Sequence, residues 1–321
     1  MSFFSHRELC RFLIALLLSM ESLYGIPSVS PPRDDPLIAA AKKGDLAEVQ
    51  ALVKQGANIE VRDWKGFTPI MWAAVRDHAD LVDFFAKQGA NVNVRSSESW
   101  TALMWATVRG RTECAEKLVQ YGAEVNATTS YQVSALMLSS TAGRPESVKL
   151  LIAHGADINA CAKDGNSALL YAAETGVPET VKILLENGAD VTIRNREGMT
   201  AVFSAAVSGV PDSVRLLAAK KADVNAADPE GLTPLHFSAT LGRVEVSRSL
   251  LDLGANVNQI SSEGETPLML AVDNGSPELV SLILERGADV TFTNKEGQSA
   301  LTIAQGLNRS EIVSLLKKWM H

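Results

Sequence analysis

The chain has 321 residues, 46% of them hydrophobic, which is enough apolar material for a continuous core. A formal net charge of −7 argues against a nucleic-acid partner, because a surface that binds phosphates needs an excess of basic residues. Three cysteines are too few for a disulfide framework, so noncovalent packing must hold the fold together.

Residues 1–25 have the pattern of a secretory signal peptide. Arg7 and Arg11 precede an apolar run at residues 12–20 (FLIALLLSM), and small residues follow it. The run is shorter than the roughly 20 apolar residues that a transmembrane helix needs. We therefore predict a signal peptide and an exported protein, periplasmic or secreted. The alternative is the frayed or amphipathic N-terminus of a cytoplasmic protein. Residues 26–34 are predicted to form a proline-rich linker.

Residues 35–321 repeat with a period of 33 residues and no insertion. A Gly-Ala pair marks the end of most repeats, and its glycines are Gly56, Gly89, Gly122, Gly155, Gly188, Gly254 and Gly287. In the sixth repeat Lys221 replaces this glycine, so we expect a strained left-handed backbone and a weak repeat there. A fixed period of this length predicts a solenoid, in which each repeat buries its apolar face only against its neighbours.

Each repeat predicts two helices and an extended finger. In residues 66–77 (GFTPIMWAAVRD) the Thr68 hydroxyl is expected to cap the first helix, with Pro69 in its first turn. A glycine such as Gly110 then ends that helix in the left-handed conformation. The second helix often begins with a proline, as at Pro145, and continues with an apolar stripe. Turn-forming Asp, Asn, Ser and Gly residues make up the finger.

The segment of residues 231–258 (GLTPLHFSATLGRVEVSRSLLDLGANVN) resembles the ankyrin repeat nearly position by position. The similarity extends over nine consecutive repeats. The resemblance implies an all-α ankyrin-repeat solenoid of stacked helix-turn-helix units with short β-hairpin-like fingers. It also implies a concave face that binds a protein partner.

Residues for catalysis or metal binding do not form a recognisable set. The sequence holds no nucleotide-binding glycine loop, no paired CxxC and no HExxH. His78, His154 and His236 fall at helix ends and starts, where we expect structural roles. We therefore predict no enzyme, no cofactor and no metal. A cavity lined by ionisable groups with perturbed pKa values would favour catalysis instead.

The partner-binding residues are expected where the repeat pattern does not dictate the residue. In the second to fourth repeats such positions hold arginines and aromatic residues, the types that dominate binding hot spots. The candidate partner-binding residues are Arg62, Trp64, Phe67, Arg76, Arg95, Trp100, Arg109 and Tyr131. We expect the four aromatic residues to be exposed anchors on one contiguous surface. Trp72 and Trp105 are expected to pack in the core.

Two further features separate the two ends of the chain. Residues 34–154 hold 13 Lys and Arg against 14 Asp and Glu, whereas residues 155–321 hold 14 against 21, so the acidic excess lies in the C-terminal part.

The glycine of the finger tip becomes Ser99 and Gln132 in the third and fourth repeats. Either these fingers adopt another turn, or the change serves binding.

These observations favour a non-catalytic scaffold that binds a protein partner through the concave face of its N-terminal repeats. The alternative is a regulatory subunit or inhibitor whose finger loops block the site of an enzyme. We expect a monomer, no nucleic-acid partner, and no membrane contact beyond the signal peptide.

Overall fold

The computed structural model describes residues 34–320, and within them the chain forms eighteen α-helices arranged as nine pairs. The predictions made for residues 1–33 lie outside this part of the chain and stay predictions. The all-α class is confirmed, because β-structure in residues 34–320 is limited to isolated bridges inside fingers. The helices divide between two compact halves that meet in sequence at Lys163 and Asp164.

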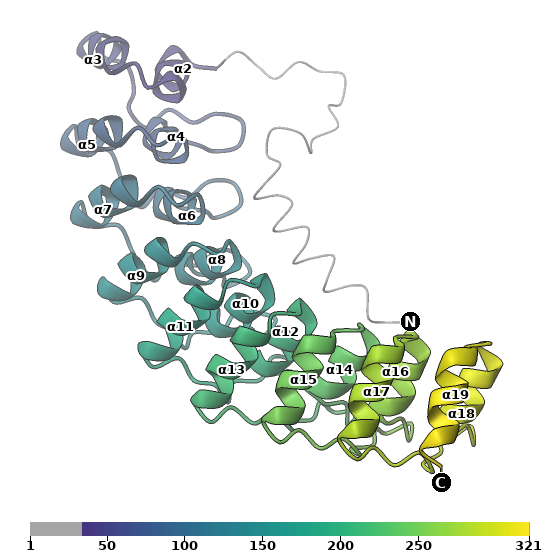
Figure 1. Cartoon of the computed structure of the whole chain (residues 1–321). Helices are drawn as coiled ribbons and strands as arrows, with labels where there is room; N and C mark the ends of the chain where they lie inside the picture. Colours follow the sequence, from purple (N-terminus) through teal and green to yellow (C-terminus); the bar gives the residue numbers. More distant parts are fainter. Residues whose placement is uncertain (1–33, 321) are drawn as a thin grey trace. The chain divides into compact units, whose positions relative to one another are not determined.

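The N-terminal half contains four helix pairs (Figure 1). They are α2 (Pro36–Lys43) and α3 (Leu46–Lys54), α4 (Pro69–Arg76) and α5 (Ala79–Lys87), α6 (Ala102–Val108) and α7 (Thr112–Gln120), and α8 (Ala135–Thr141) and α9 (Pro145–Ala153). The first helices, α2, α4, α6 and α8, pack against one another in one row, and α5, α7 and α9 form a second row beside them, on the left in Figure 1.

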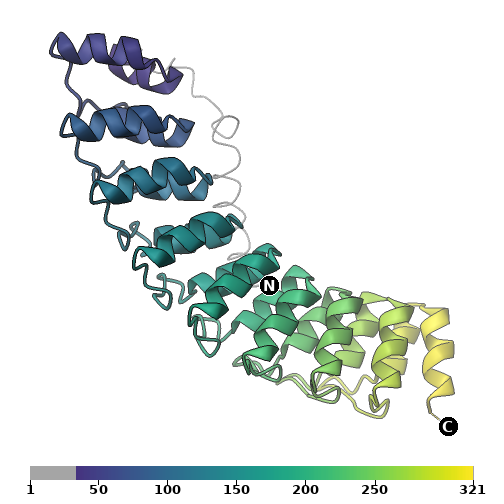
Figure 2. The same ribbon diagram turned by 60° about the vertical axis from the view of Figure 1, so that its left-hand side comes forward.

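The C-terminal half contains five pairs with the same arrangement (Figure 2). They are α10 (Ala168–Thr175) and α11 (Pro178–Glu186), α12 (Ala201–Ser208) and α13 (Pro211–Ala219), α14 (Pro234–Thr240) and α15 (Val244–Asp252), α16 (Pro267–Asn274) and α17 (Pro277–Glu285), and α18 (Ala300–Gly306) and α19 (Ser310–Lys318). Each first helix packs against the first helix of the next repeat, and alanines such as Ala205 and Ala271, which are fully buried, permit this close approach.

Hydroxyl side chains cap several first helices, but not the one we expected. Thr101, Ser134 and Thr266 each accept a hydrogen bond from the backbone N–H three residues later. Thr68 occupies the same N-cap position, yet its buried hydroxyl has no hydrogen-bond partner within residues 34–320, so this part of the prediction was wrong. The glycine at the end of the first helix behaves as predicted, since Gly110 has a φ of 71°.

Asparagine side chains join successive repeats at the base of the fingers. The Asn93 side chain donates to the Gly122 carbonyl at 3.0 Å and accepts from the Glu124 N–H at 2.8 Å. The same pair of bonds recurs at Asn126, Asn225 and Asn258. In the fifth repeat this position is Thr192, whose hydroxyl donates to Asp190 two residues earlier. The sixth repeat therefore joins the fifth without the asparagine bridge seen at these four positions.

His236 is a buried structural histidine, as the sequence predicted. It is the third residue of α14, and its Nδ1 accepts from the Thr233 N–H at 3.1 Å. Its Nε2 lies 3.3 Å from the Glu265 carbonyl, the geometry of a donated hydrogen bond. Burial lowers the pKa of the imidazole to about 4. The ring is therefore neutral near pH 7 and serves as a helix cap.

We predict that replacing Lys221 with glycine stabilises the protein by about 1 kcal/mol. Lys221 has a φ of 67°, which confirms the expected left-handed conformation. A Cβ added at the equivalent Gly188 or Gly254 would meet no atom within 4 Å, so the cost of a side chain here lies in the backbone and not in crowding. Urea unfolding followed by circular dichroism measures the gain. Lys220→Gly is the matched control: Lys220 has a φ of −96°, so the same charge is removed without relief of strain. An equal effect of both changes would contradict the strain argument.

We predict that His236 makes the protein lose stability as the pH falls from about 6.5 to 4. The unfolded histidine binds a proton near its ordinary pKa of about 6.5, whereas the folded one resists protonation down to about 4. Its contribution is thus fully present above pH 6.5 and is lost on acidification, by up to about 3 kcal/mol. Carboxylates also titrate in acid, so the measurement is the difference in unfolding free energy between wild type and His236→Gln at several pH values. A constant difference across this range would disprove the assignment.

Candidate functional site

A groove of about 230 Å³ lies in the N-terminal half. Its walls come from α4, α6, the finger before α4 and the start of α7. The lining residues are Lys65, Phe67, Trp72, Val75, Arg76, Trp105, Arg109 and Arg111. Three of the eight predicted partner-binding residues, Phe67, Arg76 and Arg109, therefore meet in one place.

Stacked aromatic rings form the floor of the groove. The Phe67 ring lies between Trp72 and Trp105, with ring centroids 4.9 and 5.3 Å apart, and Trp105 also stacks on Trp100 at 4.3 Å. The ring planes are tilted by 34°, 47° and 30°, and close aromatic pairs add stability beyond the burial of their surface. Trp105 is only 3% exposed, which confirms its predicted place in the core.

The predicted exposure of Phe67 and Trp100 was wrong: they are 4% and 6% exposed. Each residue directly precedes the N-cap of a first helix, and the residue before an N-cap often packs against the fourth residue of the helix. The partners at that distance are Trp72 for Phe67 and Trp105 for Trp100. Local helix chemistry thus draws both rings inward. Phe67 still contributes to the groove floor, whereas Trp100 does not line the groove.

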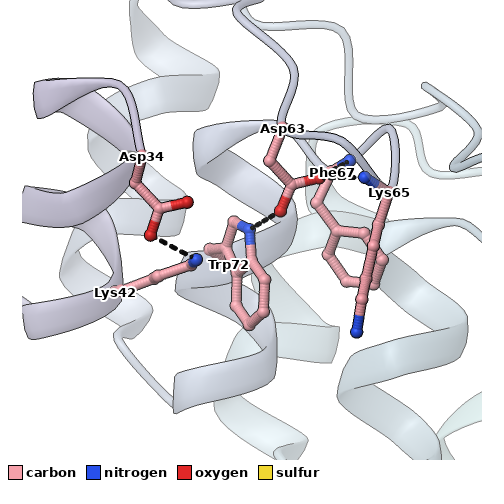
Figure 3. A network of polar contacts seen from close by, with 6 residues as sticks. All are labelled: Asp34, Lys42, Asp63, Lys65, Phe67 and Trp72. Atoms are coloured by element: carbon pink, nitrogen blue, oxygen red, sulfur yellow. Dashed lines mark hydrogen bonds and ion pairs between the residues drawn. The ribbon is translucent and has the colours of Figure 1, made fainter. Parts of the chain in front are cut away.

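Trp72 is only half-buried, so the prediction that it packs in the core holds only in part. Its indole contacts polar and charged side chains on two sides (Figure 3). The Asp63 carboxylate accepts from Trp72 Nε1 at 2.9 Å and from the backbone N–H groups of Lys65 and Phe67 at the same distance. The Lys42 ammonium lies 4.1 Å from the centre of the indole ring, a cation–π contact. The same ammonium lies 2.7 Å from the Asp34 carboxylate. The indole is therefore fixed before any ligand binds.

Cationic side chains surround this aromatic floor. Arg76 lies in the last turn of α4, Arg109 follows α6, Arg111 precedes α7, and Lys65 belongs to the finger. Arg111 lies 3.3 Å from the Asp77 carboxylate in a partly exposed ion pair. The lining thus holds four basic side chains and no acidic one. The sequence pattern did not identify Arg111 as a candidate, because arginine recurs at this position of the repeat.

Arg62 and Arg95 tie neighbouring fingers together. Arg62 donates to the Arg95 carbonyl at 3.1 Å, and Arg95 donates to the Thr128 carbonyl. Arg194 makes the equivalent bond to the Ala227 carbonyl in the C-terminal half. The bond spans 33 residues in every case, so it belongs to the repeat architecture. A partner-binding role for Arg62 and Arg95 stays a prediction.

Trp64 and Tyr131 are exposed finger residues, as predicted, at 59% and 62%. The Lys65 ammonium lies 4.7 Å from the centre of the Trp64 ring, which brings Trp64 next to the groove. The fingers that replace the tip glycine keep its backbone, since Ser99 and Gln132 have φ values of 65° and 60°. The interpretation that these fingers adopt another turn was therefore wrong.

Within residues 34–320 no group of three or more His, Cys, Asp or Glu side chains is placed to hold a metal ion. In the same residues no helix is long and apolar enough to cross a membrane.

The chain belongs to the ankyrin-repeat family. A family profile described as ankyrin repeats (3 copies) matches overlapping segments from residue 3 to residue 320, among them 37–129, 136–228 and 221–294. The crystal structure of the human ASB11 ankyrin repeat domain is similar, with a TM-score of 0.63 and 27% sequence identity over 68% of this chain and 98% of that chain. The comparison with curated proteins gave no match. Ankyrin repeats are generally protein–protein interaction modules and are typically non-catalytic.

We predict that Trp105→Ala destabilises the protein more than Trp72→Ala does. Trp105 is nearly fully buried between Phe67 and Trp100, so its loss should leave a cavity that costs about 3–5 kcal/mol. Trp72 is half-buried, so its loss leaves a smaller void, together with the loss of its hydrogen bond to the Asp63 carboxylate, which contributes about 1.5–3 kcal/mol. Unfolding by urea, followed by circular dichroism, compares the two variants. A larger loss for Trp72→Ala would contradict the assigned burial.

Proposed function

We propose that this chain is a protein-interaction scaffold whose N-terminal half binds the partner on its concave face. The observation that carries the proposal is the groove, in which aromatic rings and four cationic side chains meet. Aromatic residues and arginines are the types that contribute most to binding when they are placed together. The groove floor is preorganised by Asp63 and Lys42, so little conformational entropy is lost when a partner binds.

Trp64 extends the proposed surface beyond the groove. Its exposed indole lies beside Lys65, which itself lines the groove, so one partner segment can contact both. Single exposed aromatic residues are common on protein surfaces, but one adjoining a preformed groove is a candidate anchor. We include Tyr131 as a second exposed finger residue of the same half.

We predict that a photo-reactive phenylalanine at Trp64 cross-links the full chain to a protein partner. The change retains an aromatic ring at an exposed position, so folding should be unaffected. The same group at Ser262, an exposed finger residue of the C-terminal half that stands at the equivalent repeat position, is the control. Mass spectrometry identifies the cross-linked protein from the native source. Cross-links that form at Ser262 and not at Trp64 would place binding in the other half and contradict the proposal.

The alternative, a regulatory subunit or inhibitor, uses the same surface for a different result. An assay of the identified partner's activity with and without this chain distinguishes an inhibitor from a scaffold. Loss of the partner's activity on stoichiometric addition supports inhibition, whereas unchanged activity supports a scaffold.

A further inference from the structure

We infer that the groove takes an acidic segment of the partner protein. In this arrangement one aromatic or long apolar side chain lies against the half-exposed ring of Trp72, and neighbouring carboxylates face the surrounding cations. The inference rests on the proposed function, since it names the chemistry of the segment that the groove would hold.

The charge of the groove points to an anionic occupant. All four ionisable residues in the lining are basic, although the chain as a whole has a net charge of −7. The nearby Asp63 is engaged by Trp72 Nε1 and two backbone N–H groups, and Asp77 lies against Arg111. A local positive surface of this kind attracts and orients acidic side chains.

Helix-end electrostatics account for only part of this cluster. Arg76 and Arg109 lie at the C-terminal ends of helices, where the helix dipole favours a cation. Arg111 lies at the N-terminal end of α7, where the dipole disfavours one, and Lys65 lies in a finger outside any helix. The helix dipole therefore accounts for two of the four cations; of the other two, Arg111 pairs with Asp77 and Lys65 lies beside the Trp64 ring, so both are held at the groove.

The size of the groove favours a side chain of a protein over a free small molecule. Its volume of about 230 Å³ lies below the roughly 300–1,000 Å³ that is usual for small-molecule pockets. Guanidinium groups bind carboxylates through paired hydrogen bonds, and aromatic floors bind planar or apolar side chains. The combination selects an aromatic or apolar residue with acidic neighbours.

The test begins with a random dodecapeptide library displayed on phage and selected on the full-length chain. We expect enriched peptides in which an aromatic or long apolar residue is flanked by Asp or Glu. Synthetic copies of these peptides are then titrated by isothermal calorimetry. The double variant Arg76→Glu/Arg109→Glu should bind them at least about tenfold more weakly. Peptides with Asn and Gln in place of Asp and Glu should show a similar loss.

The control is Lys182→Glu/Lys220→Glu, which reverses two exposed charges of the C-terminal half. It should bind the same peptides as wild type does. Thermal unfolding checks that both double variants fold. Arg76→Gln/Arg109→Gln replaces the groove variant if charge reversal prevents folding.

Each other outcome contradicts the inference in a different way. One such outcome is a set of selected peptides that bind the groove variant more weakly and yet contain no Asp or Glu. This result would support the proposed function and contradict the inference that the bound segment is acidic. Peptides that bind the groove variant as well as wild type, or no enrichment at all, would contradict the groove as a binding site. Oligothymidylate that displaces the peptides at equal affinity would indicate a nucleic acid. Self-association in sedimentation velocity that the groove variant abolishes would indicate a second copy of this chain.

Discussion

Each helix pair of this chain can bury its apolar face only against the next pair, and every other feature depends on that stacking. Small residues at the contacts, such as Ala73 and Ala74, let first helices pack closely. Bonds that span about one repeat, from Asn93 to Gly122 and from Arg62 to Arg95, hold fingers at a constant spacing. A repeat architecture therefore turns local contacts into an extended surface.

The candidate groove arises where two ordinary repeat positions carry unusually large residues. The position before the N-cap and the fourth residue of the helix commonly pack together, and here the pairs are Phe67 with Trp72 and Trp100 with Trp105. Phe67 also reaches Trp105 of the next repeat, so the two pairs join into one aromatic row. The same packing that stabilises the start of a helix here also forms the floor of a surface groove.

The rigidity of this floor supports the proposed binding role. Asp63 accepts three hydrogen bonds and Lys42 lies over the indole of Trp72, so the ring cannot turn freely. A partner would meet a surface that is already in its binding geometry, which lowers the entropic cost of association. The charges of the surrounding arginines and lysine would increase the selectivity for a partner more than the affinity for it.

The sequence by itself determined the repeat length, the helix pairs, and the left-handed backbone of the helix-ending glycines and of Lys221, because each follows from local chemistry that recurs every 33 residues. It also placed Phe67, Arg76 and Arg109 among the residues of interest. Only the tertiary structure decided which side chains face outward. Phe67 and Trp100 turned inward and Arg111 joined the groove, because contacts with neighbouring repeats and with the helix start set these orientations. The 33-residue period specifies where a residue lies within its repeat. Whether its side chain is buried depends on the side chains that face it from the neighbouring repeat.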